Sequence, residues 1–127
     1  MKSILGNTRK ADITFSRNGR INISARVSKS LGLTNGDIID IIEDQDQDEF
    51  YLYVKYRSPV VGRHEGKVFR SNKSGHYFVA SSITLCRYIL SKCKVNERVS
   101  LSCGSPITLS SFGIALPIIT SNILDHA

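Results

Sequence analysis

The chain has 127 residues, of which 41% are hydrophobic, which is enough to bury one compact core or two very small ones. Lys and Arg outnumber Asp and Glu by 17 to 11, and the formal charge of +6 at pH 7 favours a polyanionic partner such as nucleic acid. The chain lacks an apolar run near the roughly 20 residues of a membrane span, and residues 1–10 lack a signal-peptide pattern, so we expect a cytoplasmic protein with no membrane partner.

The first predicted elements are the two strands of a hairpin. Residues 11–16 alternate between apolar and polar side chains, which is the period-2 pattern of a half-buried strand. The Asn-Gly pair that follows tolerates positive φ, and the alternation resumes over residues 21–24. We therefore expect a tight hairpin with Arg17 and Arg20 at its tip.

A short helix and a buried strand are predicted next. Ser24 is a suitable helix N-cap, and Gly32 can end the helix in a left-handed conformation, which leaves room for about two turns. A polar turn at residues 34–37 precedes residues 38–42. Residues 38–42 are an apolar run rich in β-branched side chains, which is typical of a strand buried on both faces.

An acidic segment and a fourth strand complete the first half. Residues 40–49 hold six of the eleven acidic residues, and we interpret this window as a hairpin loop, because its spacing lacks the glycine of a calcium-binding loop. Residues 50–56 then alternate as a strand that Ser58 and Pro59 end. These elements span about 48 residues, which is too few to enclose a core, so another part of the structure must cover them.

The second half repeats this order of elements in a degenerate form. The matching segments are 75–79 with 19–23 and 95–101 with 35–41. Between them, residues 81–92 suit a helix about one turn longer than its counterpart. A turn at residues 103–105 leads into Ile107 and Leu109, which predicts a shorter last hairpin without an acidic loop.

These patterns divide the chain into four segments. They are a first repeat at 1–57, a linker at 58–67, a second repeat at 68–112 and an apolar C-terminal tail at 113–127. The tail is too apolar for a solvated segment and too short for a membrane anchor. We therefore expect it to cap the core or to contact another subunit.

The first half also resembles a known family. Residues 19–41, GRINISARVSKSLGLTNGDIIDI, are similar to the AbrB/MazE family of swapped-hairpin DNA-binding proteins, and the opening MKS with Arg9, Lys10 and Asp12 is similar to AbrB-type regulators. In that family two strand-strand-helix-strand-strand units interleave their hairpins in one barrel. The resemblance therefore implies that a second such unit completes the core. Two copies in one chain resemble MraZ-type proteins, in which a pseudo-twofold axis replaces the homodimer.

The resemblance implies both a fold and a function. The expected fold is mainly β with short helices, a swapped-hairpin β-barrel of two degenerate repeats. The expected function is transcription regulation through double-stranded DNA, because clustered Arg and Lys neutralise phosphates and release counterions. The expected DNA-binding residues are Arg9, Lys10, Arg17, Arg20 and Lys29. Arg17 is included because the turn places it beside Arg20, whereas the resemblance implies the other four. Ser28 stands where AbrB-type proteins have the first of two adjacent helix arginines, so one phosphate contact is missing.

Enzymatic activity is not expected. The chain has no nucleophile elbow, P-loop, dinucleotide-binding glycine pattern or His-Glu-x-x-His sequence. Its three histidines are scattered, and its three cysteines lack the spacing of a zinc site or a disulfide framework. We therefore expect no metal, no cofactor and no small-molecule substrate.

The alternative is a non-enzymatic protein-interaction or structural module, either antitoxin-like or an assembly subunit, with the apolar tail as its docking segment. Antitoxins usually carry an acidic C-terminal arm, whereas this C-terminus has only Asp125. Tyr51, Tyr53 and Tyr56 could stack on single-stranded bases, but barrel packing is the commoner role of aromatic residues on an alternating strand. A lone arginine is also more often a solvated charge than a ligand contact. For both functions we expect a homo-oligomer.

Overall fold

The computed structural model describes residues 11–71, 77–121 and 123, and within them it is mainly β with two short helices, as expected. The elements are β1 (Ile13–Ser16), β2 (Arg20–Ile23), α1 (Ala25–Leu31), β3 (Ile38–Asp44), β4 (Glu49–Tyr56), β5 (Val68–Arg70), β6 (Phe78–Ser81), α2 (Ile83–Cys93), β7 (Arg98–Cys103), β8 (Ile107–Leu109) and β9 (Gly113–Ile119). Neither α1 nor α2, the helices of these residues, has the length and hydropathy to cross a bilayer.

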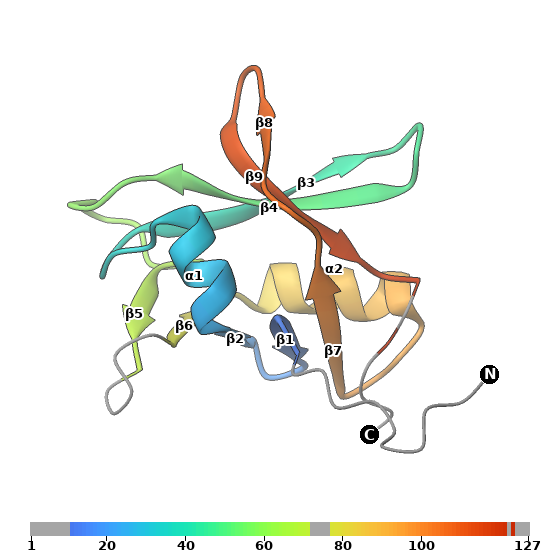
Figure 1. The fold of residues 1–127 in the computed structure, drawn as a ribbon. Helices are drawn as coiled ribbons and strands as arrows, with labels where there is room; N and C mark the ends of the chain where they lie inside the picture. Colours follow the sequence, from blue (N-terminus) through green and yellow to red (C-terminus); the bar gives the residue numbers. More distant parts are fainter. Residues whose placement is uncertain (1–10, 72–76, 122, 124–127) are drawn as a thin grey trace, which may run out of the picture.

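The strands form one strongly curled antiparallel sheet with the shape of a half-barrel (Figure 1). Their order is β3-β4-β9-β7-β1-β2-β6-β5, and β8 pairs with β9 beside this path. The β1–β2 hairpin therefore lies between two strands of the second half, β6 and β7. The two ends of the order also meet, because Ile38 forms a bridge with Lys67 and the Ile39 amide donates to the Gly66 carbonyl at 2.9 Å.

Helix α1 begins and ends at its predicted caps, and α2 lies within two residues of its predicted range of 81–92. The Ser24 hydroxyl accepts a hydrogen bond from the Val27 amide at the start of α1, and Gly32 ends that helix with φ of 62°. Ser82 caps α2 in the same way, with the Leu85 amide as donor. The predicted helices are confirmed, and α2, with 11 residues against 7, is about one turn longer.

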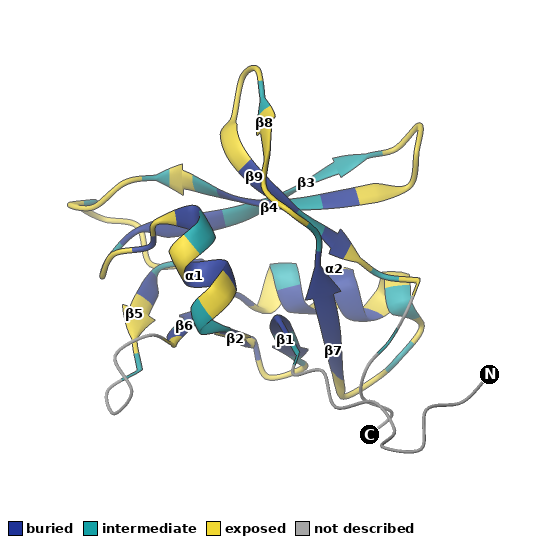
Figure 2. Ribbon diagram, viewed as in Figure 1, coloured by how far each residue is buried: buried dark blue, intermediate teal, exposed yellow. Residues whose placement is uncertain are grey.

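The core fills the space between the β3–β4–β9 part of the sheet and the β1–β2–β6 part, where both helices lie (Figures 1 and 2). Its largest fully buried side chains include Phe15, Phe50, Leu52, Ile89, Leu101 and Leu116. The side chains of Cys86 and Cys103 are buried within it, where they pack as small apolar groups.

The last strands differ from the expected hairpin. Ile107–Leu109 forms β8, which pairs with β9, whereas β9 itself lies between β4 and β7. Leu116 and Ile118 of β9 are buried opposite Leu52 and Phe50. The apolar tail thus supplies a central strand, because its buried side chains contribute more to the core than the exposed and half-buried ones of β8.

Candidate nucleic-acid interface

The β1–β2 turn presents Arg17 and Arg20 to solvent, as expected from the sequence (Figure 2 shows the exposed turn). The Gly19 amide closes the turn by donating to the Ser16 carbonyl at 2.9 Å. Gly19 has φ of 97°, and a Cβ atom there would lie 2.8 Å from Ile83 Cγ1. Glycine is therefore required, both for its backbone conformation and because the turn packs against the start of α2.

Strand register aligns four polar residues near this turn on the outer face of the sheet. Arg20 lies opposite Ser81, Ser16 lies opposite Arg98, and the β1–β2 pairing places Ser16 opposite Arg20. We call Ser81, Arg20, Ser16 and Arg98, in that spatial order, the cationic row. The neighbouring residues in these strands, Phe15, Ile21, Ala80 and Val99, are buried. Arg20, Ser81 and Arg98 are exposed and Ser16 is half-buried, so the row faces solvent.

The geometry of the cationic row suits contacts with phosphates. Arg20 and Arg98 are separated by two strand spacings, which is about 10 Å. Guanidinium and hydroxyl groups are the usual side-chain donors to phosphate oxygens, and the row alternates between them. A phosphate chain crossing these strands would therefore meet donors from four adjacent strands, β6, β2, β1 and β7.

Helix α2 adds a further cation beside the turn. Its Cys86 thiol lies 3.5 Å from the Arg20 carbonyl, and its Ile83 lies against Gly19. Arg87 is exposed and follows Ile83 by four residues, so both lie on the side of α2 that borders the turn. Neither Arg87 nor Arg98 was identified from the sequence, because only tertiary packing brings α2 and β7 to the turn.

The arginines of the turn differ from those used to hold the fold together. Among the described residues, neither Arg17 nor Arg20 has an ion-pair partner, although Arg20 Nε donates to Asn22 Oδ1 at 3.1 Å. Arg26, by contrast, donates two hydrogen bonds to Asp12 and one to the Cys103 carbonyl. The bond to Asp12 raises the pKa of Arg26, so this arginine is held as a structural cation.

Of the other expected contacts, Lys29 is the one that the structure describes. Lys29 is exposed in the last turn of α1, and the end of that helix is held by Arg57, which donates to the carbonyls of Leu31 and Gly32. Lys29 therefore lies on a separate element from the cationic row. Arg9 and Lys10 lie outside the described residues.

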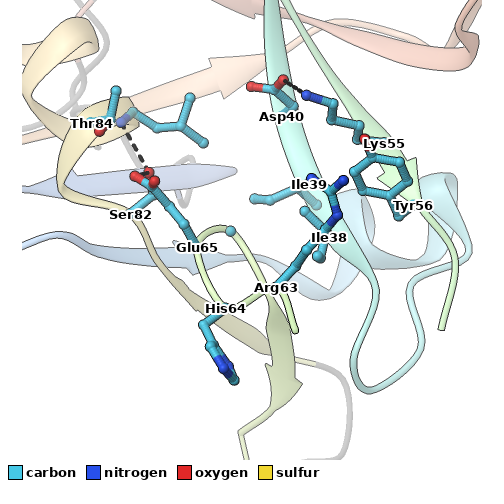
Figure 3. Close-up of a pocket in the computed structure, with 12 residues that line it drawn as sticks. Ile38, Ile39, Asp40, Lys55, Tyr56, Arg63, His64, Glu65, Ser82 and Thr84 are labelled. Carbon is cyan, nitrogen blue, oxygen red and sulfur yellow. Dashed lines mark hydrogen bonds and ion pairs between the residues drawn. The ribbon is translucent and has the colours of Figure 1, made fainter. Parts of the chain in front are cut away.

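A pocket of about 330 Å³ lies between the base of the β3–β4 hairpin, residues 63–66 and the start of α2 (Figure 3). Its charged groups bind one another. Ser82 Oγ donates to Glu65 at 2.7 Å, and hydrogen bonds from Ser82 and Thr84 lower the pKa of Glu65. Lys55 pairs with Asp40 at 3.5 Å. The Ser82–Glu65 contact joins the start of α2 to the linker, and the Lys55–Asp40 pair joins β4 to β3.

The tyrosines considered for base stacking take different roles. Tyr53 is buried, and its ring packs edge-on against Phe112 at 5.3 Å between centroids. The Arg63 guanidinium covers the ring of Tyr56 at 4.5 Å. Tyr51 donates a hydrogen bond to Glu49 at the acidic end of the hairpin, where a carboxylate repels a phosphate backbone. This strand is therefore a poor surface for nucleic acid.

No family model, curated protein or solved structure matches this chain significantly. The case for a function therefore depends on the fold and on the chemistry of its surface. Within the described residues, that surface is the outer face of a curled antiparallel sheet with solvent-exposed arginines gathered at one turn.

Proposed function

We propose that this protein is a non-enzymatic DNA-binding transcription regulator that contacts double-stranded DNA through the cationic row, Arg17 and Arg87. The observation that carries the proposal is the alignment of Arg20 and Arg98 with two serines on one exposed face, beside a turn whose Arg17 has no carboxylate partner in the described structure. Long-range attraction to phosphates would supply affinity, and guanidinium contacts to base edges would supply selectivity. The expected contacts of Arg9, Lys10 and Lys29 belong to the same proposal.

We further propose that the fold is a swapped-hairpin barrel of two repeats in one chain. The strand pairings support this proposal, because they are symmetric when β1, β2, β3 and β4 of the first repeat are equated with β5, β6, β7 and β9. The β2–β6 pair then joins equivalent strands of the two repeats. The β1–β7 pair corresponds to the contact of β5 with the start of β3, and the β3–β4 pair corresponds to β7–β9. Each hairpin would then fill the gap in the other repeat, which is how one chain would complete a core that 48 or so residues cannot enclose.

The Arg20→Ala variant is expected to bind duplex DNA more weakly and with a shallower dependence on salt. Each lost phosphate contact lowers the slope of log affinity against log salt concentration by about 0.9. The measurement is fluorescence anisotropy with a labelled duplex at several salt concentrations. Arg63→Ala is the charge-matched control, because Arg63 is exposed in the linker over Tyr56 and should leave the slope unchanged. Absence of duplex binding at low salt, or equal slopes for Arg20→Ala and the unmodified chain, would refute the proposal.

A protein-interaction module is the second candidate function, and the β8–β9 arm favours it. This arm projects from the sheet in Figure 1 and exposes Ile107, Phe112 and Ile114, the last of which is 51% exposed. Adjacent exposed apolar side chains at the edge of a sheet are typical of a contact with another chain.

The Ile114→Ser variant tests whether this arm holds a homo-oligomer together. We expect light scattering to give the mass of an oligomer for the unmodified chain and the mass of one chain for the variant, because the contact loses buried apolar area. Val61→Ser is the control, since Val61 is a 94% exposed apolar residue in the linker. Equal masses for Ile114→Ser and the unmodified chain would exclude the arm as the interface.

A further inference from the structure

Two exposed aromatic side chains lie side by side on the outer face of β5 and β6. Phe69 of β5 is 55% exposed and lies opposite Val79, and Tyr77, just before β6, is 44% exposed. The Ser71 amide donates to the Tyr77 carbonyl at 2.8 Å, so the pairing of the two strands continues as far as Tyr77. Phe69 and Tyr77 are therefore diagonal neighbours, about 7 to 8 Å apart at their Cα atoms. We call this pair the aromatic platform.

The aromatic platform contributes little to the core. Val68, Phe78 and Ala80 are buried on the inner face of the same two strands and supply their packing. A half-exposed phenyl ring on a three-residue strand leaves much of its apolar area in water, so folding alone gives little reason for it. Two such rings together form a local apolar surface, which is typical of a binding site.

The aromatic platform continues directly into the cationic row. Val79 lies opposite Asn22, and the Asn22 side chain accepts a hydrogen bond from Arg20. Phe69, Val79 and Asn22 lie side by side on β5, β6 and β2, and Arg20 is two residues from Asn22 along β2. Two strand spacings across the sheet and two residues along β2 separate the Cα atoms of Phe69 and Arg20 by about 12 Å. The face thus combines flat aromatic rings with cations on neighbouring strands. Proteins that bind single-stranded nucleic acid use this combination, because every base has a stacking face and every nucleotide has a phosphate.

We propose that this face binds single-stranded DNA, with unpaired bases stacked on Phe69 and Tyr77 and the phosphates next along the strand held by Arg20. The inference extends the proposed function, since it rests on the same cationic row, and it adds unpaired bases to the ligand. Charge complementarity argues for this occupant, because an apolar protein partner would have to cover the arginines beside the platform. A DNA segment with melted or overhanging bases would contact the whole face, whereas blunt duplex would contact only its cationic part.

The test compares a short labelled single strand with a blunt labelled duplex in anisotropy titrations of the full chain. The variants are Phe69→Ala, Tyr77→Ala and the two combined. Loss of one stacked base costs about 1 to 3 kcal/mol, so each single substitution should weaken binding of the single strand by about 5- to 150-fold. Binding of the blunt duplex should be unchanged. Phe112→Ala is the matched control, because Phe112 is 45% exposed but lies on the β8–β9 arm.

The remaining outcomes separate this inference from the proposed function. Single-strand affinity that is unchanged in the double variant, or equal losses for single strand and duplex, would overturn the stacking role. A change in the mass measured by light scattering would also overturn it, since the platform would then be a contact between copies of the chain. If the unmodified chain binds single strand but no duplex, and Phe69→Ala weakens that binding, the duplex proposal fails while the platform proposal stands. Equal thermal unfolding of all variants would exclude misfolding as the cause.

Discussion

Replacement of Asp37 by alanine is expected to lower the free energy of unfolding by about 3 to 5 kcal/mol. Asp37 is fully buried in the turn before β3. Its carboxylate accepts hydrogen bonds from the Thr34 amide at 2.9 Å, the Ser58 amide at 2.8 Å and Arg57 Nη1 at 3.0 Å. Alanine would leave these donors without their acceptor, so both the turn and the chain after β4 would lose their anchor. Urea unfolding followed by circular dichroism measures the loss.

Asp40→Ala is the matched control for this prediction. Asp40 lies three residues later, and its ion pair with Lys55 is partly exposed at 3.5 Å. Removal of such a pair costs about 0 to 1 kcal/mol. If Asp40→Ala lowers the free energy of unfolding as much as Asp37→Ala does, the buried hydrogen bonds of Asp37 stabilise the fold no more than a partly exposed ion pair does.

The Asp37 carboxylate should also make the free energy of unfolding depend on pH in the acidic range. Burial by itself raises the pKa of Asp37, but hydrogen bonds from Ser58 and Thr34 and the charge of Arg57 outweigh it, so the pKa is lowered. A lowered folded-state pKa means that the stabilisation is complete above the pKa of the unfolded chain and is lost as pH falls through the folded-state value. Below about pH 4 the unmodified chain should therefore lose stability more steeply than Asp37→Asn, which has no charge to titrate.

The Gly66→Ala variant is expected to lose about 2 to 4 kcal/mol of unfolding free energy. Gly66 has φ of 77°, and a Cβ atom there would lie 2.7 Å from the Ile39 carbonyl oxygen. The Gly66 carbonyl also accepts the hydrogen bond from the Ile39 amide that joins the linker to β3. Alanine would push the linker away from β3 and open the contact between the two ends of the strand order. Urea unfolding gives the loss, and amide hydrogen exchange at Ile39 should become faster.

Gly62→Ala separates backbone strain from this close approach. Gly62 lies in the same linker with φ of 79°, but no atom lies within 4 Å of a Cβ atom placed there. It should therefore lose only the 1 to 2 kcal/mol or so that a left-handed conformation costs an alanine. Equal losses for the two variants would mean that the contact between Gly66 and β3 does not stabilise the fold.

Local elements were predictable from the sequence because their causes are local. Ser24 and Gly32 mark the ends of α1, since a cap bonds only to groups within about four residues of itself. The β1–β2 turn with Arg17 and Arg20 was predictable for the same reason, because Gly19 permits a conformation that few residues adopt. The alternation of residues 50–56 likewise identified β4 as a strand.

The pairing of the last strands could not be predicted in the same way. Residues 107–109 and 113–119 both carry apolar side chains, and either segment could follow β7 in a hairpin. The choice depends on how much apolar area each buries against β4 across the sheet, and β9 buries Leu116 and Ile118 there. Strand β5 was missed for a similar reason, since its three residues depend on pairing with β6.

The sequence by itself determined the two helices, the caps of α1, the arginine-tipped hairpin and the mainly β composition of this protein. Only the tertiary structure decided that Arg98 would join Arg20, that Arg87 would border the turn and that Phe69 would continue the same face. The physical reason is the distance along the chain between the residues that interact. Caps and tight turns are hydrogen bonds between near neighbours in the chain, whereas the outer face is assembled by strand pairings whose register is set by burial of distant apolar side chains.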